Sequence, residues 1–181
     1  MTKLEAALLE ISGLLEELAI PFMLIGGLAV TVWGEARATL DADFSLWVEP
    51  EKLRSTVEQI CARLHPIPSQ PLSFVQDSRV LPVIASGGVR ADLVFASLPK
   101  EREVIARAKA KTIQGKDVRV VSVEDLIWMK LISERPKDID DARHLLRRHA
   151  GSLDRGYLEP IVTELAGSFA RADILEIYRE P

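Results

Sequence analysis

The chain has 181 residues and a formal net charge of −4, which argues against a broad nucleic-acid footprint. Its single cysteine, Cys61, excludes an intrachain disulfide, and its length fits one domain or one domain with a helical extension. We therefore expect a cytoplasmic protein with Cys61 buried on a helix. We expect no membrane partner, because no apolar run approaches the roughly 20 residues needed to span a bilayer.

The N-terminal residues predict a helix, a buried strand and a second, shorter helix. Leucine and isoleucine recur at helical spacing over residues 3–18, and Pro21 ends this segment. The apolar run 22–25 is closed by Gly26-Gly27, which is typical of a buried strand that ends in a tight turn. The short segment 28–34 then predicts a helix.

The stretch 41–48 alternates with a period of two and therefore predicts a strand. One face carries apolar side chains, and the other is expected to carry Asp41, Asp43, Ser45 and Trp47. A helix is predicted over 51–64, with Pro50 as its first residue.

The middle of the chain reads as strands separated by turns. Strand-like runs lie near 73–76, 80–84 and 89–95, and the turn Ser86-Gly87-Gly88 joins the last two. After a helix over 100–109, the runs 111–114 and 117–121 flank Gly115-Lys116 and predict a hairpin.

From Ser122 onward the pattern is helical only. Ser122 suits an N-cap, and helices are predicted over 122–134, 136–149, 154–166 and 170–178. The change of pattern predicts a core at 1–121 and a C-terminal helical segment at 122–181 packed on it. The fold class is α/β (α+β): a small mixed sheet flanked by helices.

Three carboxylates are the candidates for metal chemistry. Asp41 and Asp43 are two residues apart on one strand face, which places their Cα atoms roughly 6.6 Å apart. Asp92 is isolated in an otherwise apolar strand and is the best candidate for a third ligand. Carboxylate oxygens suit Mg²⁺, and two ions clamped by such a group would serve phosphoryl or nucleotidyl transfer. Taken alone, an Asp-x-Asp on an edge strand is usually a solvated face, and a lone strand aspartate beside an arginine is usually a surface ion pair.

Gly26 and Gly27 are the candidates for phosphate contact. Glycine lets the backbone approach a triphosphate closely, and the amides at a helix N-terminus face an anion. A Gly-Gly pair after a strand is also common as a simple turn.

The conjunction of these features resembles a known superfamily. An apolar residue, Gly26-Gly27, thirteen residues, Asp41-x-Asp43 and a later strand with Asp92 are similar to nucleotidyltransferases of the DNA polymerase beta type. The longer stretch from Ile25 through Asp43 resembles the minimal bacterial nucleotidyltransferases that include the AbiEii-type toxins of toxin–antitoxin systems.

The resemblance implies a nucleotidyltransferase-like fold and assigns roles to single residues. It implies metal ligation by Asp41, Asp43 and Asp92, with Asp92 also helping to activate the attacking hydroxyl. It implies phosphate contact around Gly26 and Gly27; where the superfamily often has a serine, this chain has Gly27, so one side-chain contact to phosphate is missing.

Further nucleotide-binding candidates have two interpretations each. Lys130 stands alone in an apolar helix, so it either reaches a phosphate or snorkels or pairs with Asp138 or Asp141. Arg37 either meets a phosphate or pairs with Glu35 or Asp41. Thr39 lies in the same loop and joins this nucleotide-binding set.

The sequence thus predicts an Mg²⁺-dependent transfer of a nucleotidyl group from an NTP to an RNA or protein hydroxyl. The expected partners are the NTP, the acceptor RNA or protein, and a cognate toxin or antitoxin. The rival hypothesis is a non-catalytic nucleotide-binding or antitoxin-like interaction module, and the three retained carboxylates weigh against it.

Overall fold

The computed structural model describes residues 1–34 and 39–180, and it divides into two compact units. Among the described residues, the first unit contains 1–29 and 39–121, and the second contains 30–34 and 122–180. Helix α2 (Gly26–Val32) passes from one unit to the other, so the second unit begins inside it.

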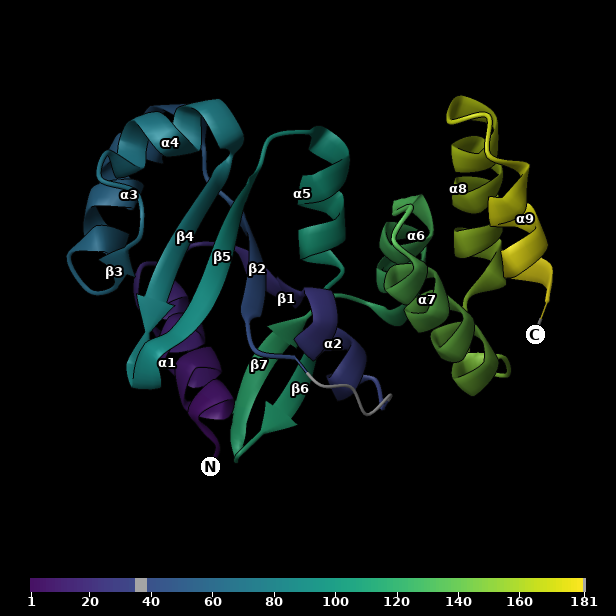
Figure 1. Ribbon diagram of the computed structural model, residues 1–181, viewed down its shortest axis with the longest axis horizontal. Coiled ribbons are helices and arrows are strands. Elements are labelled where there is room, and N and C mark those ends of the chain that lie inside the picture. Colours follow the sequence, from purple (N-terminus) through teal and green to yellow (C-terminus); the bar gives the residue numbers. More distant parts are fainter. Residues whose placement is uncertain (35–38, 181) are drawn as a thin grey trace. The chain divides into compact units, whose positions relative to one another are not determined.

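The first unit is built on a seven-stranded mixed sheet with the strand order β3-β4-β5-β2-β1-β7-β6 (Figure 1). The strands are β1 (Phe22–Ile25), β2 (Ala42–Trp47), β3 (His65–Pro66), β4 (Val80–Ala85), β5 (Val89–Ala96), β6 (Lys109–Ile113) and β7 (Lys116–Val120). The helical segments of this unit are α1 (Lys3–Glu17), the start of α2, η1 (Pro50–Lys52), α3 (Leu53–Cys61), α4 (Pro71–Ser78), η2 (Ser86–Gly88) and α5 (Pro99–Ala106).

The direction of the central strands determines which ends of them meet. Strand β2 pairs antiparallel with β1 and parallel with β5, while β4 and β5 form an antiparallel hairpin. Helix α1 packs against β2, β4, β5 and β7, and α3 and α4 lie together where β5 ends (Figure 1). The amino ends of β2 and β5 therefore lie side by side, and so do their carboxyl ends.

The alternation predicted for β2 is confirmed on its apolar face. Ala42, Phe44 and Leu46 are all fully buried, as their spacing of two requires. The opposite face is less polar than expected, because Ser45 is buried and the guanidinium of Arg102 from α5 lies 5.2 Å from the ring centre of Trp47. On this face Asp41 is exposed, Asp43 and Trp47 are half-buried, and Ser45 is buried.

One predicted element is wrong. The run at 73–76 belongs to helix α4 and not to a strand, because Pro71 occupies a first-turn position of a helix that continues to Ser78. Its apolar residues meet the core at a single fully buried position, Val75. The strands near 80–84 and 89–95, the turn at Ser86–Gly88 and the hairpin of β6 and β7 are confirmed.

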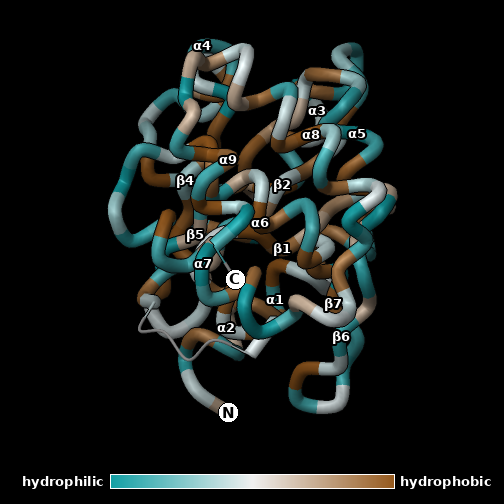
Figure 2. Tube along the Cα trace, turned by 90° about the vertical axis from the view of Figure 1, so that its right-hand side faces the viewer, coloured by the Kyte–Doolittle hydropathy of each residue, from teal (hydrophilic) through white to brown (hydrophobic). Residues whose placement is uncertain are grey.

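The second unit is helical. It contains α6 (Val123–Ile132), α7 (Pro136–His149), α8 (Arg155–Ser168) and α9 (Ala172–Arg179), which matches the predicted order of helices. Ser122 caps α6 by accepting a hydrogen bond from the Asp125 amide. Figure 2 shows hydrophobic and hydrophilic residues succeeding one another along the helices, the pattern of helices with one buried side.

No described helix combines the length and the hydropathy that crossing a membrane would demand. Cys61 is half-buried at the last position of α3, slightly more accessible than expected, and burial raises the pKa of its thiol.

Candidate active site

The site begins where β1 ends. Gly26 follows Ile25 with a φ of +68°, a left-handed conformation that glycine adopts without strain, and it starts α2. Ile25 is the register partner of Asp43. A Cβ at Gly26 would overlap the carboxylate of Asp43 and lie 2.9 Å from its Cγ. Only glycine at this position avoids a steric clash with the Asp43 carboxylate.

Asp43 and Asp92 lie side by side. They are register partners on the parallel strands β2 and β5, so their Cα atoms are about 4.8 Å apart and their side chains share a face. Both are half-buried. The Nε and Nη2 of Arg90 donate to Asp92, at 3.1–3.3 Å from its two carboxylate oxygens. This pair of carboxylates forms the centre of the candidate site.

Asp41 lies just before β2 and is exposed. Its Oδ1 accepts a hydrogen bond of 3.0 Å from the hydroxyl of Thr39, so these two predicted site residues do contact each other. Within 1–34 and 39–180, however, no three histidine, cysteine or acidic side chains are gathered as a metal would need. The structure thus brings Asp43 and Asp92 together and leaves Asp41 outside a three-carboxylate cluster.

Two further residues predicted for phosphate contact are Gly27 and Arg37. Gly27 is buried in the first turn of α2, directly after the turn at Gly26. Arg37 lies outside the described residues.

Lys130 belongs to the second unit and is buried, with 7% of its surface exposed. Its Nζ forms ion pairs with Asp138 and, at 3.0 Å, with Asp141, both of which are also buried. Asp138 accepts a further hydrogen bond from Ser133 and pairs with Arg135. Of the two interpretations of Lys130, the one with carboxylate partners describes its contacts in the structure.

Burial acts to raise the pKa of Asp138, but the hydrogen bonds from Lys130 and Ser133 and the charges of Lys130 and Arg135 outweigh it. The pKa of this carboxyl is therefore below its ordinary value of 3.8.

The sequence did not predict the contact between His149 and Trp33, which lies just after α2. In the second unit, the Nε2 of His149 lies 3.0 Å from the carbonyl oxygen of Trp33, and the two rings meet edge to face. Gly34 has a φ of +102°, and a Cβ there would lie 2.5 Å from the Nε of Arg148. The end of α7 thus contacts the residues that follow α2. A contact across more than a hundred residues leaves no signal in local sequence patterns.

The comparisons with known proteins agree with this architecture. The model of the family described as "Nucleotidyltransferase of unknown function (DUF6036)" matches residues 2–179. No curated protein matches the chain in sequence.

Among solved structures, the antibiotic-resistance factor ANT(2″)-Ia in solution is similar with a TM-score of 0.61 at 18% identity, over 93% of this chain and 94% of its own. An antigenic nucleotidyltransferase-like protein from Paracoccidioides brasiliensis has a TM-score of 0.61 at 16% identity, over 98% and 92%. The lincosamide antibiotic adenylyltransferase LnuA with bound lincomycin has a TM-score of 0.55 at 13% identity, over 80% and 98%. These likenesses confirm the predicted fold class.

The substitution Gly26→Ala is expected to destabilise the protein by about 2–5 kcal/mol. The left-handed conformation costs about 1–2 kcal/mol for alanine, and the overlap with Asp43 adds a packing penalty of about 1–3 kcal/mol. Chemical denaturation measures the loss, and Gly88→Ala is the matched control, because Gly88 has a φ of +76° and open space around its Cβ position. Equal losses in both variants would contradict the close approach to Asp43, and adding Asp43→Ala should recover the difference.

Asp138→Asn is expected to cost about 3 kcal/mol near neutral pH, because it leaves a buried lysine short of a charge partner. Since the folded state lowers the pKa of Asp138, this stabilisation is complete above the ordinary carboxyl pKa and is lost as the pH falls through the lowered value. Urea denaturation should therefore show the difference from wild type shrinking below about pH 4. The control Asp140→Asn, on the exposed side of the same helix, should change stability by less than about 0.5 kcal/mol at every pH. A pH-independent difference would refute the assignment.

Proposed function

The chain belongs to the nucleotidyltransferase family DUF6036, and from this premise we propose that it transfers a nucleotidyl group from an NTP to an acceptor hydroxyl. The observation that carries the proposal is the placement of Asp43 beside Asp92, with Gly26 against Asp43. Nucleotidyl transfer needs carboxylates that hold divalent metal against the phosphates. It also benefits from a glycine turn at a helix start, where the backbone can approach the triphosphate closely.

The residues fit a divalent cation by the chemistry of their donors. Asp43 and Asp92 are register partners and present carboxylate oxygens, the ligands that Mg²⁺ prefers, and the absence of a side chain at Gly26 leaves room for the Asp43 carboxylate. We propose that Asp43 and Asp92 hold two Mg²⁺ ions, and that Asp41, which is exposed just before β2 and not gathered with them in this structure, joins them when metal binds. When bound, these ions would neutralise charge on the attacking and leaving oxygens.

The reaction forms one bond and breaks one. The acceptor oxygen bonds to the α-phosphorus of the NTP, the bond from that phosphorus to the bridging oxygen breaks, and pyrophosphate leaves. We assign the proton of the acceptor hydroxyl to Asp92, which lies within the site and beside Asp43. Arg90 keeps the Asp92 side chain oriented through its hydrogen bonds.

The triphosphate is assigned to the backbone at Gly26 and Gly27, with Arg37 and Thr39 as side-chain contributors. Thr39 supports this assignment because its hydroxyl already lies against Asp41. For Lys130, the ion pairs with Asp138 and Asp141 favour a structural role that joins α6 to α7.

The acceptor is proposed as an RNA or protein hydroxyl, with the chain acting beside a cognate partner in a toxin–antitoxin system, as in the AbiEii-type enzymes that the sequence resembles. A small-molecule hydroxyl is the second candidate. It is favoured by the similar folds of ANT(2″)-Ia and of the lincosamide adenylyltransferase LnuA, which cover most of this chain.

Labelled NTPs test the proposal directly. The protein is incubated with Mg²⁺ and each NTP, together with total RNA, cell lysate, or a panel of aminoglycosides and lincosamides. Label is expected in one acceptor class, and that class identifies the acceptor. The Asp43→Asn and Asp92→Asn variants should each reduce labelling by about 10³-fold or more, because the metal-binding and proton-accepting groups are removed.

Asp77→Asn is the matched control, since Asp77 is an exposed carboxylate on α4. It should label at the wild-type rate. Undiminished labelling by the Asp43→Asn variant would overturn the site. Calorimetry that detects no NTP binding in the presence of Mg²⁺ would overturn the function, including the rival hypothesis of a nucleotide-binding module.

A further inference from the structure

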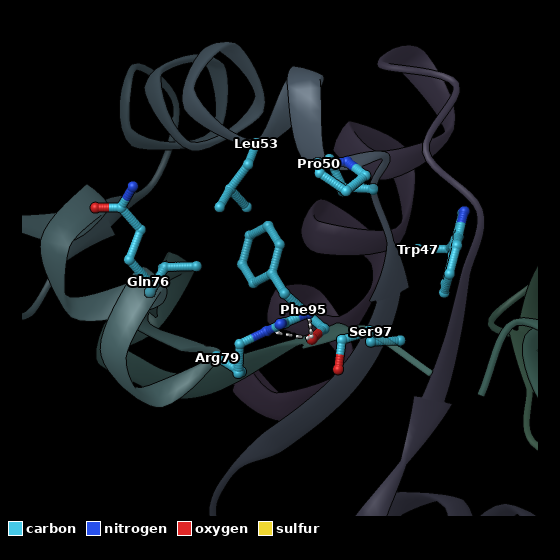
Figure 3. A pocket seen from close by; sticks show the side chains of 10 residues that line it. Trp47, Pro50, Leu53, Gln76, Arg79, Phe95 and Ser97 are labelled. Carbon is cyan, nitrogen blue, oxygen red and sulfur yellow. Dashed lines mark hydrogen bonds between the residues drawn. The ribbon is translucent and has the colours of Figure 1, made fainter. Parts of the chain in front are cut away.

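The first unit contains a cavity of about 280 Å³ at the carboxyl ends of β2 and β5. Its apolar walls are Leu53 of α3, Val75 of α4 and Phe95 of β5. Figure 3 shows Leu53 and Phe95 facing each other across it, with the guanidinium of Arg79 close to the Phe95 carbonyl. Val75 and Phe95 are buried within the fold, Leu53 is half-buried, and Gln76 and Arg79 are exposed, so the cavity opens to solvent on their side.

This cavity is separate from the carboxylates of the active site. Phe95 follows Asp92 by three residues in the same strand, so their side chains point to opposite faces of the sheet. The register pair Trp47 and Ala96 at the cavity is four residues from the pair Asp43 and Asp92, which is about 13 Å along the strands. A ligand bound here would therefore lie about 13 Å along the strands from the carboxylates.

Arg79 gives the cavity its charge. Among the described residues that line the cavity, it is the only charged one, and no described carboxylate lies within ion-pair distance of it. Its Nε and Nη2 donate to the carbonyl oxygen of Phe95 at 3.3 and 3.2 Å. This anchors the guanidinium beside the apolar walls and leaves its other N–H groups for an acceptor.

The backbone at this position does not require arginine. Arg79 ends α4 with a φ of +63°, a left-handed conformation that favours glycine or asparagine. The bonds that fix the turn come from the main chain: the Arg79 amide donates to the Val75 carbonyl, and the Arg79 carbonyl accepts from the Phe95 amide. Any residue other than proline would supply these bonds, so the positive charge is an added feature placed at strained backbone.

We propose that this cavity binds a small organic acid with an apolar, aromatic-sized body. The body would fill the space between Leu53, Val75 and Phe95, and the carboxylate would take the free N–H groups of Arg79. Gln76 and Ser97 line the same cavity and offer further hydrogen bonds to the acid. The proposal is independent of the nucleotidyl transfer proposed above.

The test uses 3-phenylpropionate and indole-3-acetate as probes, each beside its uncharged amide, with NMR chemical shifts of the full-length protein as the readout. For ligands of this size a Kd of about 1 mM is expected for the acids, with the amides at least about tenfold weaker. The shifts should centre on Leu53, Val75 and Phe95 and leave Asp43 and Asp92 unmoved. Equal affinity for an acid and its amide would overturn the proposal, and so would chemical-shift changes centred on Asp43 and Asp92. The proposal would also be overturned if neither acid changed the chemical shifts at about 10 mM.

Two substitutions separate charge from shape. Arg79→Asn suits the left-handed backbone but removes the charge, and it should weaken acid binding by about tenfold or more. Arg79→Lys keeps the charge and should retain most of the affinity. Leu53→Trp fills the cavity and should abolish binding with the charge intact. Thermal unfolding of each variant establishes that it is folded, and wild-type affinity in the Arg79→Asn variant would refute the assigned role of Arg79.

Discussion

The parallel pairing of β2 with β5 is the constraint on which the candidate site depends. One register places Asp43 beside Asp92, Phe44 beside Leu93 and Leu46 beside Phe95. A slip of β2 by one residue would turn Asp43 into the core and expose Phe44 and Leu46, so burial of the apolar face fixes the position of Asp43 beside Asp92. The same hydrophobic packing that stabilises the sheet therefore also assembles the site.

Gly26 links that register to the start of α2. Because β1 pairs with the other edge of β2, its last residue, Ile25, lies beside Asp43, and the chain must turn at once. A side chain on the next residue would collide with the carboxylate, so the turn and the acid can coexist only with glycine at position 26. The register of β1 with β2 thus places the start of α2 next to the Asp43 carboxylate, and glycine at position 26 makes this close approach sterically possible.

Local periodicity predicted the parts of this arrangement that depend on neighbours in sequence. The alternation in β2, the isolation of Asp92 and the glycine pair all leave a pattern within a few residues. The strand predicted at 73–76 was wrong because a short apolar stretch is compatible with either a strand or a helix when only its neighbours in sequence are considered. The burial of Ser45 and the contact of His149 with Trp33 depend on residues far away in the chain. Patterns within a window cannot report such contacts.

Lys130 shows where sequence patterns leave a choice that only packing decides. A buried ammonium needs a compensating partner, and the sequence allowed either a phosphate, which its pattern slightly favoured, or the acidic residues of the next helix. The chain folds α7 against α6 so that Asp138 and Asp141, one turn apart, both meet the lysine. Two carboxylates against one ammonium would leave an excess negative charge, and Arg135 at the rim of the group balances it. Since the charges of this cluster are matched among protein side chains, folding of the helical unit does not require a bound nucleotide to complete it.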